Sequence, residues 1–294
     1  MGEEVLLSVN GVELCAQTFG ERGDAPVLLV GNSMLTWPEE LCELLAGGGR
    51  FVLRYDLRDT GRSTMADPAA PRYTLRDLVA DAAGLLDAFG LPRAHVAGFG
   101  VGGWIAQLLA LDHPGRVASL TLAATRPVAP GPNDPDLPEH SPKLMAAMMA
   151  APEPDWTDRA SVIEAMVAGR RHVAGTAGFD EDWARRHVER IFDRTVVPAG
   201  TDPAMAHRSN QTAIVFAALD CGDRWRERLG SVTAPTLVIH GEDDPFFPIG
   251  NGRALAKEIP GAELIGLPGA GQELPPRVWE VMAFAILRHT RSGV

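Results

Sequence analysis

The feature that most constrains the fold is an alternation of short apolar runs with longer amphipathic segments along the first 125 residues. Between the runs, amphipathic segments lie at about 38–47, 75–89 and 101–112, and the apolar residues of 75–89 recur at helical spacing. Strands that alternate with helices are typical of a mostly parallel sheet covered by helices on both faces. The sequence therefore predicts an α/β fold, with strands near 5–9, 12–18, 26–30, 50–55, 94–98 and 117–124.

The pattern is interrupted from Val128, where Pro-rich loops lead into helical stretches rich in Met, Trp and Arg up to about residue 228. The alternation then resumes, with strands predicted at 235–240 and 262–267 and helices at 250–258 and 276–290. Such an insertion lies over the carboxyl ends of the strands, where ligands bind in open α/β sheets. We predict a core of residues 1–127 and 229–294 with a helical lid of residues 128–228.

Charge and cysteine usage exclude several classes of partner and cofactor. The net charge of −11 and the absence of a long Lys or Arg run argue against nucleic acid, and the pairs Arg170/Arg171 and Arg185/Arg186 are interpreted as solvated helix faces. Three widely spaced cysteines without a His cluster argue against a disulfide framework or a metal site. We expect no metal, nicotinamide or flavin, and the sequence gives no oligomeric state.

The N-terminal residues carry acids where a signal peptide needs basic residues, and they form no sustained apolar segment. The longest nearly apolar stretch, residues 96–111, contains four glycines and is interpreted as a strand, a turn and a buried helix. These features, with the free cysteines, predict a cytoplasmic protein that does not bind membranes.

Three segments at predicted strand ends carry recognisable motifs. Residues 52–63 contain Asp56-Leu-Arg-Asp59-Thr-Gly-Arg-Ser63, residues 240–245 read His-Gly-Glu-Asp-Asp-Pro, and residues 98–102 read Gly-Phe-Gly-Val-Gly. These segments resemble the D-x-R-G-x-G-x-S block, the acid-bearing turn and the G-x-S-x-G elbow of the α/β-hydrolase superfamily. The block departs from the family pattern at Asp59, where glycine is usual.

The resemblance covers essentially the whole chain, and it assigns Asp244 as the acid of the catalytic triad. It also places Gly100 at the position of the nucleophile, and Gln272, at the end of Pro268-Gly-Ala-Gly-Gln272, at the position of the catalytic histidine. Glycine has no nucleophile, and a glutamine amide neither accepts nor returns a proton near neutral pH. Hydrolysis through an acyl-enzyme is therefore excluded at this site.

Within the superfamily the chain resembles actinobacterial methyl esterases of anthracycline biosynthesis. The patches that carry this likeness are Trp37-Pro38, Arg54-Tyr-Asp56, residues 59–63 and Leu111-Asp-His113. The resemblance implies a pocket for flat polycyclic polyketides, and it extends to a triad-deficient branch from anthraquinone-fused enediyne pathways.

Loss of side chains leaves a backbone oxyanion hole in place, for which the inferred donors are the N–H of Val101 and that of Asn32 or Ser33. Asp244, Glu273 or the lid residue His207 is then the candidate acid or base. The competing interpretations are that Asp244 accepts a hydrogen bond from Gln272, that Glu273 is a solvated loop acid, and that His172, His187 and His207 lie on the surface. The predicted catalytic residues are Asp244, Gln272, Val101 and Asn32, and those predicted to contact the substrate are Gly100, Ser33, Met34, Trp37, Trp104, Arg126, His207 and Glu273.

These features predict a tailoring enzyme of secondary metabolism that acts without hydrolysis on a polycyclic aromatic polyketide, for example by cyclisation or carbon–carbon bond formation. Three alternatives stay open. The first is a non-catalytic ligand-binding protein on a hydrolase scaffold. The second is an esterase with a displaced nucleophile such as Ser33. The third is dinucleotide binding, because Gly98-x-Gly100-x-x-Gly103 follows a strand and opens a helix.

Overall fold

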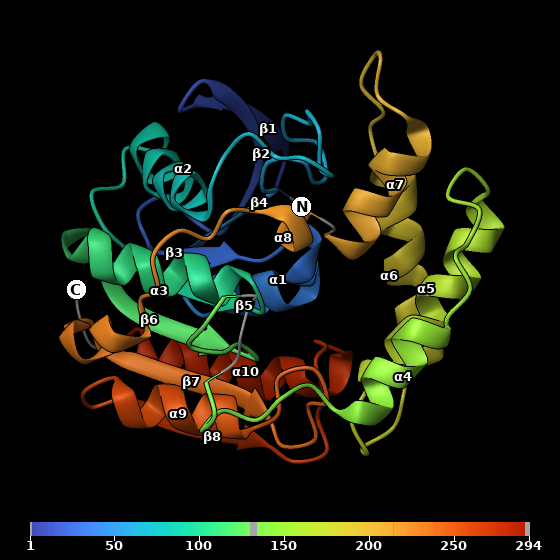
Figure 1. Ribbon diagram of the computed structural model, residues 1–294. Helices are drawn as coiled ribbons and strands as arrows, with labels where there is room; N and C mark the ends of the chain where they lie inside the picture. The colour runs from blue at the N-terminus through green and yellow to red at the C-terminus, as the bar shows by residue number, and fades with distance from the viewer. Residues whose placement is uncertain (1, 130–133, 214, 292–294) are drawn as a thin grey trace.

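The computed structural model describes residues 2–129, 134–213 and 215–291, and within them eight strands form one sheet in the order β1-β2-β4-β3-β5-β6-β7-β8 (Figure 1). The pairs β1–β2 and β2–β4 are antiparallel, and the other pairs are parallel. The predicted α/β architecture is confirmed. The strands are β1 (Glu4–Val9), β2 (Val12–Phe19), β3 (Ala25–Val30), β4 (Arg50–Tyr55), β5 (Ala94–Phe99), β6 (Val117–Ala123), β7 (Thr236–Gly241) and β8 (Glu263–Leu267).

Helices cover both faces of the sheet, and each face has its own hydrophobic cluster. One cluster joins the sheet to α2 (Leu75–Ala88), α3 (Gly102–Asp112), α8 (Val215–Ala218) and α9 (Gly250–Glu258). The other joins it to α1 (Glu39–Gly47) and α10 (Pro276–His289). Short 3₁₀ turns are η1 (Met34–Thr36), η2 (Pro114–Arg116) and η3 (Arg226–Ser231). No helix in the described part of the chain is long and apolar enough to cross a membrane.

Four of the helices between β6 and β7 project from the sheet as an arm (Figure 1). They are α4 (Pro142–Ala150), α5 (Arg159–Val173), α6 (Glu181–Arg194) and α7 (Pro203–Thr212). An aspartate caps the first turn of each of the last three helices, because its carboxylate accepts otherwise unpaired backbone N–H groups. The return segment differs from the arm, since Leu219 and Trp225 pack in the core cluster beside α3. Of the Pro-rich loop, Pro130 and Pro132 lie outside the described residues.

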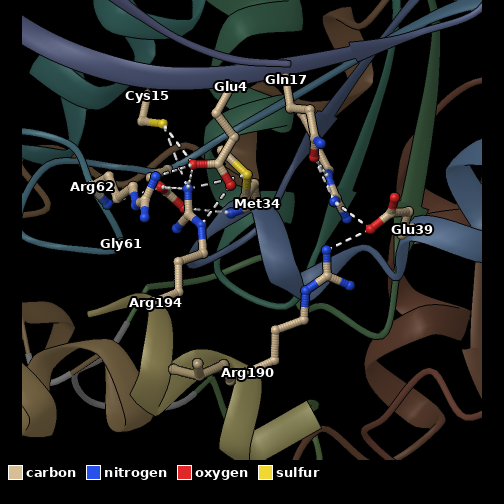
Figure 2. A network of polar contacts seen from close by, with 12 residues as sticks. Glu4, Cys15, Gln17, Met34, Glu39, Gly61, Arg62, Arg190 and Arg194 are labelled. Atoms are coloured by element: carbon tan, nitrogen blue, oxygen red, sulfur yellow. Dashed lines mark hydrogen bonds and ion pairs between the residues drawn. The ribbon is translucent and has the colours of Figure 1, made fainter. Parts of the chain in front are cut away.

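Charged side chains of α6 fasten this arm to the core (Figure 2). Arg194 pairs with Asp56 at 2.7 Å and with Glu4 at 2.8 Å, and Arg190 pairs with Glu39 at the start of α1. Asp56 is fully buried and follows β4 directly, so the Arg194 side chain extends to the carboxyl end of this strand.

Helix α7 contacts the loop that follows Asp56. The Ser209 hydroxyl donates to the Asp59 carbonyl at 2.6 Å, and the Asn210 amide oxygen accepts from Gly61 N–H at 2.6 Å. The arm is therefore held against the carboxyl edge of the sheet through both α6 and α7.

Candidate active site

The turn between β5 and α3 is where a G-x-S-x-G segment places its nucleophile, and here that residue is Gly100. Its φ of +57° lies in the left-handed region, as expected for this sharp turn. Its N–H donates to the Ala123 carbonyl at 3.0 Å, and its carbonyl accepts from the Thr125 hydroxyl at 2.6 Å. Among the described residues, and apart from its two chain neighbours, a Cβ at this position would have one atom within 4 Å, Gln272 Nε2 at 3.5 Å, so a small side chain would fit there.

Gln272 comes from the loop after β8 and faces Gly100. Its side-chain Nε2 donates to the Ala124 carbonyl at 2.8 Å, while Oε1 is buried without a hydrogen-bond partner among the described residues. Its backbone N–H donates to the carbonyl of Val173, at the end of α5, at 2.9 Å. The amide thus points at the end of β6 and does not bond to Asp244, which rules out the interpretation that Asp244 accepts a hydrogen bond from Gln272.

Asp244 lies in the turn after β7 and is only 3% exposed. Its Oδ1 accepts from the N–H groups of Phe246 at 2.8 Å and Phe247 at 2.9 Å, while Oδ2 has no hydrogen-bond partner in the described ranges. His240 Nε2 is 3.7 Å from Oδ2, but it donates to the Phe247 carbonyl at 2.6 Å. Burial raises the pKa of Asp244 to about 7, despite the two N–H donors that favour the carboxylate. A group with this pKa can both accept and return a proton near neutral pH.

The two expected oxyanion donors differ in availability. The Val101 N–H lies at the half-exposed N-terminus of α3, and no acceptor is assigned to it within the described residues. The N–H groups of Asn32 and Ser33 are both directed at Thr36 Oγ1, at 3.1 and 3.3 Å, because η1 folds back on them. The prediction of a second backbone donor at Asn32 or Ser33 is therefore not met in this structure. Asn32 keeps a half-exposed side-chain amide that makes no hydrogen bond in the described part of the chain.

Two residues predicted to shape the pocket lie in the core or at its boundary. Trp37 is fully buried, donates from Nε1 to the Val30 carbonyl at 3.0 Å and meets Phe99 edge-on. Met34 is 1% exposed and packs with Ile191 of α6, where the arm meets the core. Trp37 thus contributes to packing beneath the site.

Two further residues predicted to contact the substrate, Trp104 and Arg126, lie beside the turn that carries Asp244. Trp104 packs edge-on against Phe216 and tilted against Phe247, and its indole N–H is buried without a partner in the described residues. The Arg126 guanidinium donates to the Val128 and Ala129 carbonyls at 3.1 Å and lies over the Phe247 ring. Arg126 therefore holds its own loop, in contrast to the predicted position facing a ligand.

His207 belongs to the arm, whereas Glu273 lies in the loop after β8. His207 stacks on Phe192 of α6 with ring centroids 3.9 Å apart, and burial lowers its pKa, so it is a neutral residue within the arm. Glu273 follows Gln272 directly and is 5% exposed, which contradicts the solvated interpretation. Its Oε1 is 3.5 Å from Arg277 and its Oε2 has no partner among the described residues. Burial raises the pKa of Glu273, and the charges of Arg277 and Arg170 partly offset this rise.

The sequence interpretation missed three arm residues that face the core. Arg170, expected to be solvated, is partly buried and interacts electrostatically with Glu273. His187 stacks on Trp183, and burial holds its pKa well below the usual range. Arg194 pairs with Asp56 as described above. Helical spacing marks Arg170 in advance, because it continues the apolar positions Ile163 and Val167 along one face of α5.

Packing accounts for the glycines of the dinucleotide-like fingerprint. A Cβ on Gly98 would lie 2.4 Å from the Gly102 carbonyl oxygen, and one on Gly103 would lie 2.5 Å from the Thr125 side chain. These glycines allow β5, α3 and the end of β6 to approach closely. Within the described ranges, no three His, Cys, Asp or Glu side chains are grouped as a metal site would need.

A family model for the alpha/beta hydrolase fold matches residues 26–274 of the chain. The chain belongs to the alpha/beta hydrolase family. This hydrolase-fold protein is 34% identical to a rhodomycin D methylesterase from Streptomyces sp. (strain C5), with 98% of each chain covered. It is 33% identical to a putative carbamate hydrolase from Variovorax paradoxus, over 82% of this chain and 81% of the relative. The predicted likeness to methyl esterases of anthracycline pathways is confirmed.

Solved structures support the same fold. A hydrolase from Pseudomonas aeruginosa superposes with a TM-score of 0.71 at 25% identity, and 98% of each chain is covered. A meta-cleavage product hydrolase from Pseudomonas fluorescens superposes with a TM-score of 0.73 at 18% identity, over 99% of this chain and 98% of the other. The likeness to the second structure concerns the fold alone.

Proposed function

We propose that this protein is a tailoring enzyme that acts without hydrolysis on a polycyclic aromatic polyketide, by cyclisation, carbon–carbon bond formation or related acid/base chemistry. The observation that carries the proposal is Gly100, a residue without a side chain at the elbow of a chain that matches a rhodomycin D methylesterase over 98% of its length. The relative supports the substrate class, and the elbow argues against the relative's reaction.

Ester hydrolysis on this fold needs an oxygen nucleophile and a base that relays its proton. Gly100 supplies no oxygen, and the Gln272 amide is bonded to the Ala124 carbonyl, where it relays nothing to Asp244. Ser33 is poorly placed to act as the nucleophile, because it is buried in the η1 turn and no histidine bonds to its hydroxyl in the described residues. A different reaction on the same scaffold is the simpler interpretation.

Two groups remain that suit proton transfer. The carboxyl of Asp244 titrates near neutral pH, and the Val101 N–H at the N-terminus of α3 favours negative charge on a nearby oxygen. In the proposed reaction Asp244 takes a proton from an acidic C–H of the substrate, and the enolate oxygen faces Val101. The enolate carbon attacks an electrophilic carbonyl carbon of the same molecule, and the resulting alkoxide takes the proton back from Asp244. The sum is an isomerisation that needs no co-reactant.

The test is mass analysis of anthraquinone polyketides that carry a methyl ester and an enolisable side chain, before and after incubation with the protein. We expect a product of unchanged mass with a new retention time, because the proposed reaction is an isomerisation. Asp244→Asn should abolish this product, because the amide cannot accept the proton. Glu242→Gln, an exposed acid two residues away, is the matched control and should keep it.

Two other outcomes would contradict the proposal. A product lighter by one methylene unit would mean ester hydrolysis and a displaced nucleophile, and its loss in Ser33→Ala would identify that nucleophile. Tight binding of a polyketide that is recovered unchanged under all conditions would mean a ligand-binding protein on a hydrolase scaffold.

A further inference from the structure

Arg170 lies on the inner face of α5, one of the helices of the arm. In α5, Ile163 and Val167 are buried against Val188 of α6, and Arg170 lies one turn further along the same face. Its neighbour Arg171 lies on the outer face, where it is exposed and pairs with Glu181. The two adjacent arginines therefore have the same charge but opposite surroundings.

The end of α5 is fixed to the loop that carries Gln272. The Val173 carbonyl accepts from Gln272 N–H at 2.9 Å, and the Gly269 carbonyl accepts from Ala177 N–H at 3.0 Å. A Cβ on Gly271 would lie 2.0 Å from the Val173 oxygen, so the two segments are in direct backbone contact. Arg170, three residues before Val173, is thereby held at the edge of the candidate site.

The charge of the Arg170 guanidinium is not neutralised at close range. In the described ranges it makes no hydrogen bond and no ion pair within 4 Å, and its interaction with Glu273 acts over a longer distance. Glu273 Oε2 is itself buried and unpaired. His187 supplies no negative charge either, because an imidazole is neutral or cationic, and burial and the nearby arginines lower its pKa so that it is neutral.

A buried carboxylate oxygen without a partner is costly, and a half-buried guanidinium without a close counter-charge is available to an anion. A ligand that offers an anion and a hydroxyl would satisfy both groups. We propose that Arg170 binds an acidic group of the substrate, a carboxylate or an ionised phenol, and that Glu273 accepts a hydrogen bond from an adjacent hydroxyl. The inference rests on the proposed function for the aromatic nature of the ligand, but on no particular reaction.

The experiment measures binding of anthraquinone-2-carboxylate and of its carboxamide to the full chain by titration of tryptophan fluorescence. We expect the carboxylate to bind on the order of ten- to a hundredfold more tightly, as for one charge-assisted hydrogen-bonded contact. Arg170→Gln should reduce this preference to about unity, and Arg170→Lys should keep part of it because the charge remains. Arg171→Gln, the matched control, should keep the full preference and equally lowers the net positive charge of α5.

The same titration with 2-naphthoate and 2-naphthamide separates the two proposals. Preference for both acids, lost only with Arg170, supports the inference. Preference for naphthoate with no binding of either anthraquinone would contradict the proposed substrate class and leave Arg170 as an acid-binding residue. Equal binding of acid and amide, or a preference that survives in Arg170→Gln with a native circular dichroism spectrum, would overturn the inference alone.

Discussion

Replacing Arg194 with Met tests how the arm is held to the core. The substitution keeps a long side chain but removes the guanidinium that pairs with the Asp56 carboxylate. In this pair the Asp56 side chain is 0% exposed and the Arg194 side chain is 9% exposed. Breaking a buried pair leaves one charge uncompensated and typically costs about 3–5 kcal/mol. Asp56 retains the N–H donors of Met34 at 2.9 Å and Arg62 at 3.0 Å, so we expect a loss of about 3 kcal/mol, the lower end of that range.

Urea unfolding of the wild-type protein and of two variants measures this loss. The matched control is Arg190→Met on the same helix, which breaks the pair with Glu39 where the arginine is 45% exposed, and should cost about 0–1 kcal/mol. Burial raises the pKa of Asp56, with Arg194 acting against the rise. Without Arg194 the carboxyl accepts a proton more readily, and the protonated form costs less to bury. The deficit of Arg194→Met should therefore shrink as the pH falls through the pKa of Asp56.

Two results would refute this account. Equal losses in Arg194→Met and Arg190→Met would mean that the Asp56 pair contributes no more than a surface pair. A deficit that does not change with pH would mean that the cost comes from the lost contact with Met34 Sδ, and not from the uncompensated carboxylate.

Further predictions concern the elbow and the acid. Gly100→Ser should fold with a loss of about 1–2 kcal/mol for an L-residue at φ +57°, whereas Gly100→Val should lose more because a β-branched residue is disfavoured there; thermal unfolding compares them. The rate of substrate conversion should rise with pH through about 7, the pKa of Asp244, and this step should be absent in Asp244→Asn. Because that pKa is raised from 3.8, wild-type stability should fall as the pH rises from about 4 to about 7, and the fall should be smaller in Asp244→Asn. Gly100→Ser with Gln272→His should restore weak esterase activity, a few orders of magnitude below a natural enzyme; a folded double variant that no activated ester acylates would mean that the oxyanion donors are lost as well.

The spacing of apolar residues predicted the helices and strands whose burial pattern is visible in the local sequence. Apolar residues at helical spacing in 75–89 predicted α2 almost to the residue, and the Thr74 hydroxyl caps its start by accepting from Asp77 N–H. The motif positions of Gly100, Asp244 and Gln272 were also predictable, because each follows a strand whose carboxyl end lies at the same edge of the sheet. The residues that contact these positions come from other segments of the chain, and the local sequence pattern does not identify them.

The residues whose contacts differ from the prediction do so for one physical reason. The N–H groups of Asn32 and Ser33 were inferred to be free, but the fold of η1 turns them to Thr36. Arg126 follows its strand as predicted, yet the carbonyls of its own loop accept the guanidinium hydrogen bonds that the structure describes. Arg170 was predicted to be solvated together with Arg171. Neighbouring residues on a helix point in different directions, however, and only Arg171 is exposed. In each case the direction of a donor decides its role, and direction depends on three-dimensional packing.

The contacts at the elbow and at position 272 explain why the fold does not depend on a serine or a histidine there. Gly100 is held by its own N–H and carbonyl, and Gln272 is joined to α5 through its backbone N–H, which donates to Val173. None of these bonds requires a particular side chain at either position. Asp244, in contrast, organises its turn through carboxylate bonds to two backbone N–H groups, so its side chain has a structural role whatever the chemistry. Retention of the acid alone is therefore weak support for catalysis by Asp244, and the decisive observation is whether proton transfer stops when Asn preserves the Oδ1 contacts.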